Sequence, residues 1–207
     1  MATTTAAETT SMTYLCPEVA GITMTPDEFD NADFDRGFRY ELIRGVVVVS
    51  PMTSPFERGP NELLGYWLLD YQRRHPQGSV LDGTLSENDI FIGDERRRAD
   101  RVIWAGLGRT PSVEETPTIA IEFVSTGKRN FLRDYEEKRH EYASVGVQEY
   151  WVVNRFNRTL TVYRGPTEVE VHKENETYNP HLLPGFELRL IELFEAADRW
   201  ENKSRRP

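Results

Sequence analysis

The chain has 207 residues, of which 38% are hydrophobic, 11% aromatic and 29% charged, a composition typical of a folded globular protein rather than a disordered one. Its 25 Lys and Arg against 34 Asp and Glu give a formal net charge of −9, which argues against a wholly basic nucleic-acid-binding surface but leaves room for a local basic groove. The lone Cys16 excludes an internal disulfide, no basic residue precedes Arg36, and no apolar run reaches the ~18 residues of a membrane span. We therefore expect a soluble, cytoplasmic protein.

One folded domain is expected between two polar ends. Residues 1–23 are rich in Thr and Ala and show no hydrophobic periodicity, so we expect a disordered, mobile leader. Residues 24–200 carry recurrent apolar runs, and their length suits a single domain with one main core. Residues 201–207 form a polar tail.

Three elements are predicted in the first part of this domain. A capping box with a proline in the first turn starts a helix at residues 25–28. The β-rich run RYELIRGVVVVS, residues 39–50, predicts a hairpin that turns at Arg44-Gly45. Residues 61–74 are predicted to be helical because apolar side chains recur at helical spacing, at Leu64, Trp67, Leu68 and Tyr71.

A long helix between two groups of strands is predicted for the remainder. Strands are expected at SVLD, ENDIFIG, ADRVIW and TIAIEFVS, and a helix over residues 129–145 that ends before Gly146. Further strands are expected at VQEYWVVN, TLTVYR, EVEVHK and PGFELRL, followed by a short helix at IELFEAAD. This order predicts an α/β fold with a mixed central sheet flanked by helices.

Glu122 interrupts the most apolar strand of the chain. The run TIAIEFVS is otherwise almost continuously apolar, as in a central strand covered on both faces. An unpaired carboxylate in such a strand costs several kcal/mol, so Glu122 requires a cation, a partner or an open cleft. The alternative is an acid at a strand end that binds a neighbouring arginine.

Asp100 shows the same pattern, because it leads directly into the apolar run Val102-Ile103-Trp104. An aspartate at the start of a strand is also common, so Asp100 alone leaves both interpretations open. Two carboxylates on adjacent strands would make an oxygen-rich site suited to a hard divalent cation such as Mg²⁺. Such an ion can polarise a phosphodiester and lower the pKa of a bound water.

Lys138 lies on the predicted inward face of the helix over 129–145. It comes three residues after Tyr135 and four before Tyr142, which belong to the apolar stripe of that helix. A lysine is rare at such a position unless its ammonium group reaches a buried acid or a site, where it could neutralise charge in a transition state. The alternative is a lysine whose stem is buried while its ammonium group reaches solvent and pairs with Asp134.

Other candidate groups are weaker. Arginines 96–98 form a basic run that could contact phosphates or could lie in a solvated turn. The four histidines show no metal-ligand spacing, and the chain has neither a GxSxG motif nor a phosphate-binding glycine loop.

Three segments in order, YELIRG, RRRADRVIW and IAIEFVSTGKRNFLRDYEEKRHEYASVGVQEYWVV, resemble the Uma family of restriction endonuclease domains, which belongs to the PD-(D/E)XK nuclease superfamily. The resemblance covers roughly residues 25–200. It implies a restriction-endonuclease-like fold, a mixed central sheet flanked by helices. Its most specific part follows IEFVS and comprises Asp134, Lys138, Tyr142, Gly146-Val147 and Glu149-Tyr150-Trp151.

The resemblance also implies site residues. Asp100 corresponds to the aspartate of the motif, Glu122 to the second metal-binding acid, and Glu41 to an early glutamate that usually faces the same site. The superfamily lysine usually lies two residues after the second acid, where this chain has Val124. In the Uma-type pattern that lysine comes from the following helix, which matches Lys138.

Two departures from the family pattern are visible. Ala99 replaces the proline that usually precedes the aspartate, which changes local stiffness and not ligand chemistry. Relatives often carry a histidine near the start of the helix that holds Leu64, where this chain has Asn61 and Glu62. This difference argues against a histidine-assisted step.

The resulting hypothesis is an endonuclease that depends on Mg²⁺ or Mn²⁺ and acts on DNA. Asp100 and Glu122 are the expected metal ligands, and Glu41 and Lys138 complete the catalytic set. A homodimer is expected because related folds usually pair to cut two strands, and no membrane association is expected. The alternatives are a catalytically inactive nuclease-fold module for binding or assembly, which the acidic charge and the missing histidine favour, and a metal-dependent hydrolase of another phosphoester.

Overall fold

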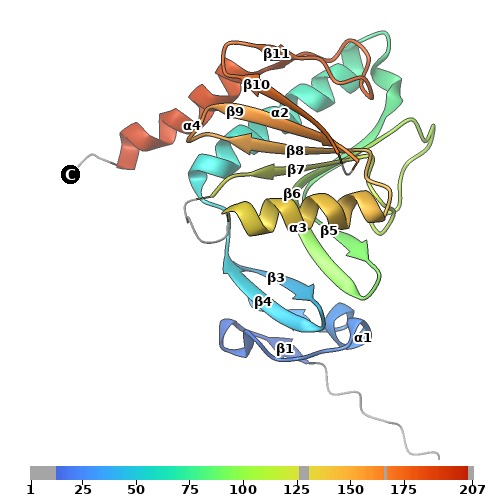
Figure 1. Cartoon of the computed structure of the whole chain (residues 1–207), viewed down its shortest axis with the longest axis vertical. Helices are drawn as coiled ribbons and strands as arrows, with labels where there is room; N and C mark the ends of the chain where they lie inside the picture. Colours follow the sequence, from blue (N-terminus) through green and yellow to red (C-terminus); the bar gives the residue numbers. More distant parts are fainter. Residues whose placement is uncertain (1–12, 126–130, 166, 205–207) are drawn as a thin grey trace, which may run out of the picture.

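A mixed sheet of eight strands forms the centre of the fold (Figure 1). The computed structural model describes residues 13–125, 131–165 and 167–204. Seven strands follow one another across the sheet in the order β10 (Glu168–Lys173), β9 (Thr159–Arg164), β8 (Glu149–Asn154), β7 (Ile119–Phe123), β6 (Glu95–Ala105), β3 (Phe38–Ile43) and β4 (Val46–Pro51). The eighth, β5 (Leu81–Ile92), pairs with β6. β7 and β8 are parallel, and the other neighbouring strands are antiparallel.

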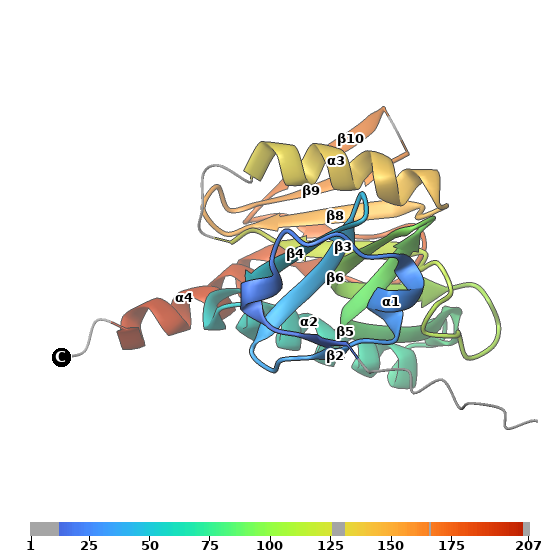
Figure 2. The ribbon, with the colours of Figure 1, turned by 90° about the horizontal axis from the view of Figure 1, so that it is seen from below.

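Helices cover both faces of this sheet, as seen in Figure 2. α2 (Pro55–Arg74) and α4 (Leu190–Ser204) pack on one face, and α3 (Phe131–Ser144) packs on the other. The main core lies on the first face and the second core lies under α3, around Ala120, Tyr142 and Val152. The predicted α/β fold with flanking helices is therefore confirmed. Over the described parts of the chain, no helix combines the length and the apolar character needed to cross a bilayer.

A third, smaller core joins the N-terminal segment to the hairpin of β3 and β4. Leu15 of β1 (Tyr14–Leu15) is fully buried in one cluster with Phe29 of α1 (Pro26–Asp30) and with Tyr40 and Leu42 of β3. β1 also pairs in parallel with β2 (Asp33–Phe34). The expected mobile leader over 1–23 is therefore wrong for residues 13–23, because Leu15 anchors a stretch whose Thr-rich and Ala-rich surroundings suggested no order. Residues 1–12 lie outside the described residues.

The predicted helix starts rest on recognisable caps. The α1 capping box is present, since Thr25 Oγ1 accepts from the Glu28 N–H at 3.2 Å and the Glu28 carboxylate accepts from the Thr25 N–H at 2.8 Å. α2 begins at Pro55 rather than at residue 61. The Glu57 carboxylate accepts from the Ser54 N–H at 2.8 Å at this earlier start, and the helix continues through its internal proline.

Two further predictions differ in extent from the structure. SVLD and ENDIFIG are not separate strands, because Ser79 and Val80 belong to a 3₁₀ turn and the single strand β5 runs from Leu81 to Ile92. α4 extends to Ser204 and so includes residues expected to belong to the polar tail. The remaining short elements are η1 (Pro17–Val19), η2 (Gly78–Val80), β11 (Thr177–Tyr178) and β12 (Leu188–Arg189).

Candidate functional site

The candidate site lies where β3 and β7 meet the same long strand, β6. β6 pairs with β7 through Arg101, opposite Ile121, and with β3 at Arg96. One further step of the β6–β7 register places Asp100 opposite Glu122, so the two acids belong to the same face of the sheet. That face is covered by α3. Four more charged side chains complete what we call the acidic junction, which consists of Arg39, Glu41, Glu87, Asp100, Glu122 and Lys138.

Asp100 is buried and is held from two sides. Its Oδ2 accepts from the Phe123 N–H at 2.6 Å, and its Oδ1 accepts from Arg39 Nη1 at 2.8 Å. Burial raises the pKa of Asp100 above its ordinary value, while Arg39 and the Phe123 N–H act in the opposite direction. Asp100 is therefore fixed in orientation at the boundary between β6 and β7.

One carboxylate oxygen of Glu122 accepts hydrogen bonds from a lysine and from a tyrosine of α3. Lys138 Nζ lies 2.7 Å from Glu122 Oε1, and the Tyr142 hydroxyl donates to the same oxygen at 3.0 Å. The pKa of Glu122 is raised to about 7, because burial and the negative charge of Asp100 together outweigh the lowering by Lys138. The Glu122 carboxyl group can therefore exchange a proton near neutral pH.

Lys138 links Glu122 to the acid of β3. Lys138 Nζ lies 3.9 Å from Glu41 Oε1, which also accepts from the Arg98 N–H at 3.0 Å. Burial alone would lower the pKa of Lys138, but Glu122 and Glu41 raise it above its ordinary value. Burial likewise opposes the lowered pKa of Glu41, which results from Lys138 and the Arg98 N–H. Because Lys138 is only 8% exposed, its ammonium group meets acids and not solvent; the expected partner Asp134 lies outside the described side chains.

Sequence analysis does not predict two members of the acidic junction. Arg39 and Glu41 lie two residues apart on β3, so their side chains share one face of the strand. This spacing is visible in the sequence and could have indicated Arg39. Arg39 Nη2 donates to the Arg98 carbonyl oxygen at 2.8 Å, and Arg39 Nε lies 3.2 Å from Glu87 Oε2. Glu87 has a φ of 53°, in the left-handed region, and the ladder of β5 and β6 skips it. No motif in the sequence marks that conformation.

α2 supports Asp100 from the opposite face of β6. Asn61 Nδ2 donates to the Asp100 carbonyl oxygen at 2.8 Å, and Asn61 Oδ1 accepts from Arg101 Nε at 2.6 Å. Arg101 Nη2 donates to the Asn61 carbonyl oxygen at 3.0 Å. Gly65 makes room for this guanidinium group, because a Cβ atom there would lie 2.6 Å from Arg101 Nη2. Asn61, near the position where relatives often carry a histidine, therefore has a supporting role here.

The basic run 96–98 lies within β6 and not in a solvated turn. Arg96 binds Asp30 at 2.6 Å and Arg97 binds Glu141 at 2.7 Å, and both arginines are buried. Arg98 lies within ion-pair distance of two acids of β5. All three guanidinium groups are therefore paired with acids, which weakens their case as phosphate contacts.

The oxygen donors of the acidic junction fit a hard divalent cation. The junction has four carboxylates and two cationic side chains, so it carries two excess negative charges when all six groups are ionised. Mg²⁺ is usually held by one or two carboxylates, with waters and substrate phosphates as the other ligands. Among the residues that the structure describes, no three His, Cys, Asp or Glu side chains gather closely enough to hold a metal alone. Asp100 and Glu122 would therefore share the ion with water and substrate oxygens.

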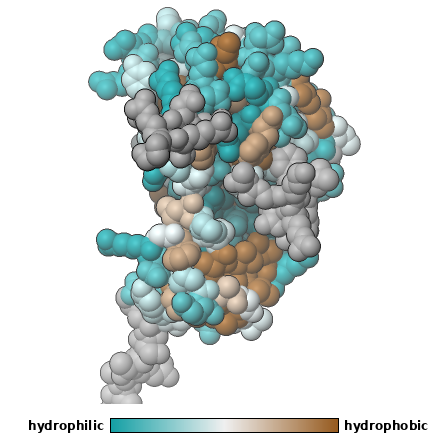
Figure 3. Space-filling view, turned by 90° about the vertical axis from the view of Figure 1, so that its left-hand side faces the viewer, coloured by the Kyte–Doolittle hydropathy of each residue, from teal (hydrophilic) through white to brown (hydrophobic). Residues whose placement is uncertain are grey.

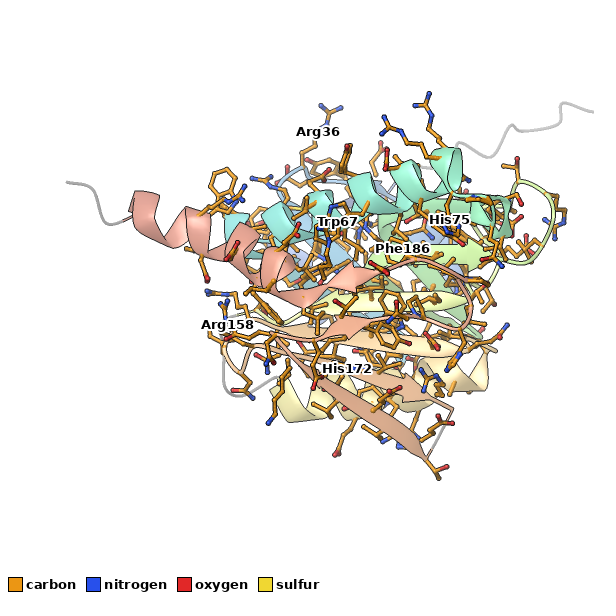
Figure 4. All side chains as sticks on the ribbon, turned by 90° about the horizontal axis from the view of Figure 1, so that it is seen from above. Arg36, Trp67, His75, Arg158, His172 and Phe186 are labelled. Carbon is orange, nitrogen blue, oxygen red and sulfur yellow. The ribbon has the colours of Figure 1, made fainter. Side chains whose placement is uncertain are left out.

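Two of the histidines, His75 and His172, are labelled in Figure 4 and lie in different parts of the fold. His75 follows α2 and stacks on Tyr71, with ring centroids 5.1 Å apart. His172 lies on β10, where its Nε2 is 3.2 Å from Glu170. Neither His75 nor His172 has a contact with a member of the acidic junction among these interactions.

The sequence matches the profile of the Uma2 family, described as “Putative restriction endonuclease”, over residues 26–191. The chain belongs to the Uma2 family. The matched stretch includes all four predicted site residues, Glu41, Asp100, Glu122 and Lys138. The comparison with curated proteins gives no match.

A solved structure has the same fold as this Uma2 member. It is a crystal structure described as “a putative nuclease belonging to DUF820” from Anabaena variabilis ATCC 29413. The two chains share 18% sequence identity with a TM-score of 0.70, and the comparison covers 84% of this chain and 99% of that chain. At this identity the likeness shows the fold alone. The family supports a nuclease-like function.

Proposed function

We propose that this Uma2 protein is an endonuclease that uses Mg²⁺ or Mn²⁺ to hydrolyse DNA phosphodiester bonds. The observation that carries the proposal is the pair of buried acids Asp100 and Glu122, which face each other on adjacent strands, with Lys138 Nζ 2.7 Å from Glu122. Paired carboxylates beside a fixed ammonium group suit metal-assisted hydrolysis of a phosphodiester.

Asp100 and Glu122 would hold the metal ion. When bound, a divalent cation polarises the phosphodiester and lowers the pKa of a coordinated water. Burial raises the pKa of both acids, so each is ionised less readily than an exposed acid. Added positive charge next to these carboxylates would offset that cost of burial.

Glu41 and Lys138 would act on the water and on the phosphate. The lowered pKa of Glu41 keeps its carboxylate ionised near neutral pH, so it can orient a water beside the ion. The raised pKa of Lys138 keeps its ammonium group charged. Lys138 can then neutralise the negative charge that develops on the phosphoryl oxygens.

DNA is the substrate that this proposal assigns, on the strength of the Uma2 family. Figure 3 shows that one face of the molecule is hollowed above the part that carries β3 and β4, and hydrophilic residues line the hollow. Because the net charge is −9, DNA binding would depend on local contacts and on the metal ion rather than on the overall field. A homodimer would supply two sites for two strands, and a cytoplasmic location, which the free Cys16 favours, completes the proposal.

A cleavage assay with matched variants tests the function. Supercoiled plasmid and single-stranded DNA are incubated with the purified chain in Mg²⁺, in Mn²⁺ or in EDTA. We expect Asp100→Asn and Glu122→Gln, which keep side-chain size, to reduce cleavage on the order of 100-fold or more. The control Asp70→Asn changes an exposed acid on α2 that pairs with Arg74, and its cleavage should equal that of the wild type.

The assay also separates this function from the inactive binding module. One observation favours the module, namely that Arg39 already neutralises Asp100. Unchanged cleavage in both Asp100→Asn and Glu122→Gln would refute the assigned residues. If the wild type neither cuts DNA nor binds Mn²⁺, but forms a stable dimer or binds a protein partner, the endonuclease proposal is wrong and the binding module is supported.

A further inference from the structure

Arg39 lies where a metal ion would be expected to bind Asp100. Asp100 Oδ2 is turned toward the backbone, where it accepts from the Phe123 N–H at 2.6 Å. The other oxygen, Oδ1, is therefore the one available to a cation, and Arg39 Nη1 lies 2.8 Å from it. A Mg²⁺ ligand distance is about 2.0–2.1 Å, so an ion on Oδ1 would lie very close to the guanidinium group, and two positive charges at a buried site repel strongly.

Two other groups, the Arg98 carbonyl and Glu87, contact the Arg39 guanidinium and would hold it without Asp100. Its Nη2 donates to the Arg98 carbonyl oxygen at 2.8 Å, and its Nε lies 3.2 Å from Glu87 Oε2. Glu87 is itself positioned, because the Thr53 hydroxyl donates to its Oε1 at 3.1 Å. The left-handed backbone at Glu87 is an uncommon conformation for a residue with a side chain, and such conformations cluster at functional sites.

We propose that Arg39 is a resident cation that competes with the divalent metal ion for Asp100 Oδ1. Metal binding breaks the ion pair between Arg39 and Asp100, and Glu87 and the Arg98 carbonyl group retain the displaced guanidinium. Arg39 thereby neutralises Asp100 in the absence of metal and lowers the affinity of the junction for a divalent metal ion. This inference rests on the proposed metal site and adds its regulation.

Binding of Mn²⁺ without DNA tests the competition, measured by titration calorimetry and by the electron paramagnetic resonance signal of free Mn²⁺. We expect Arg39→Gln to bind Mn²⁺ at least tenfold more tightly than the wild type, which corresponds to about 1.4 kcal/mol. The control Arg98→Gln removes a positive charge beside the same Glu87. The Arg98 side chain makes no contact with Asp100 among its ion pairs. Its affinity should stay within about threefold of the wild type, because the half-buried Arg98 side chain pairs with Glu87 and Asp89 and not with Asp100.

Two further variants keep the test decisive. In Arg39→Gln with Asp100→Asn, the gain in affinity should disappear, because Asp100 is the contested ligand. If circular dichroism shows that Arg39→Gln is not folded, Arg39→Lys is tested in its place. A lysine cannot hold Asp100, Glu87 and the Arg98 carbonyl group at once, so we expect an affinity about threefold tighter than that of the wild type.

The outcomes distinguish this inference from the proposed function. Unchanged or weaker Mn²⁺ binding in the folded Arg39 variants overturns the competition, even where the wild type cuts DNA. Tighter binding in the variant, with no cleavage by the wild type, supports the competition and overturns the endonuclease. Absence of Mn²⁺ binding in every variant overturns both.

Discussion

Glu122→Gln provides a direct test of the charge balance in the metal-free acidic junction. The change keeps the size of the side chain and leaves an oxygen that can accept from Lys138 and from the Tyr142 hydroxyl. It removes the ionisation of an acid whose pKa burial raises to about 7, from an ordinary value of 4.5. The variant should therefore gain stability relative to the wild type as the pH rises.

The sign and the size follow from proton linkage. Between about pH 4.5 and pH 7 the folded wild type binds more protons at Glu122 than the unfolded chain does, so its free energy of unfolding falls as the pH rises and levels off above this window. With about 1.4 kcal/mol for each pKa unit, the ionisation of Glu122 costs the wild type about 2–3 kcal/mol between pH 5 and pH 8. The variant does not lose this stability.

Urea unfolding followed by the fluorescence of the buried Trp104 and Trp151 measures the effect in EDTA at several pH values. The difference in the free energy of unfolding between Glu122→Gln and wild type should move in favour of the variant by about 2–3 kcal/mol from pH 5 to pH 8. Asp70→Asn, at an exposed ion pair, should follow the wild-type curve. A constant difference between Glu122→Gln and the wild type across this range would refute the assignment of a raised pKa to Glu122.

Two further substitutions test the packing around the site. Leu15→Ala should reduce the free energy of unfolding by about 2–4 kcal/mol, since Leu15 is fully buried; a change below about 0.5 kcal/mol in urea unfolding would mean that the N-terminal segment does not pack. Gly65→Ala should destabilise by about 1–3 kcal/mol, although alanine normally favours a helix, because its Cβ would displace Arg101 from Asn61. A higher melting temperature for Gly65→Ala would contradict this account.

Much of the fold follows from local patterns in the sequence. The apolar run around Glu122 predicts a buried strand, and β7 is buried at every position. The turn at Arg44-Gly45 and the stop before Gly146 need positive φ angles, which these residues have in the structure. Glu122 in an apolar strand and Lys138 in an apolar helix stripe are informative, because a buried charged group has few possible partners other than an opposite charge. That reasoning predicts that the two groups meet at one site, and in the structure Lys138 Nζ lies 2.7 Å from Glu122 Oε1.

The features that sequence analysis does not predict depend on contacts between distant segments. Arg39 and Asp100 lie 61 positions apart, and only the pairing of β3 with β6 brings them together. Glu87 enters the junction through a backbone irregularity opposite β6, which depends on register and not on residue type. Leu15 carries no periodic signal, because a two-residue strand is too short to show one.

Lys138 places a positive charge beside Glu122 from a helix rather than from the strand that carries Glu122. In the PD-(D/E)XK pattern that the sequence resembles, the lysine lies two residues after the second acid, and here Val124, directly after β7, occupies that position. Val124 packs in the same cluster as Tyr142, one helical turn from Lys138 on α3. The strand position and the helix position thus face a shared space beside Glu122. An ammonium group from either element could neutralise the same charge, so the chemistry constrains the location of the charge more tightly than the residue that supplies it.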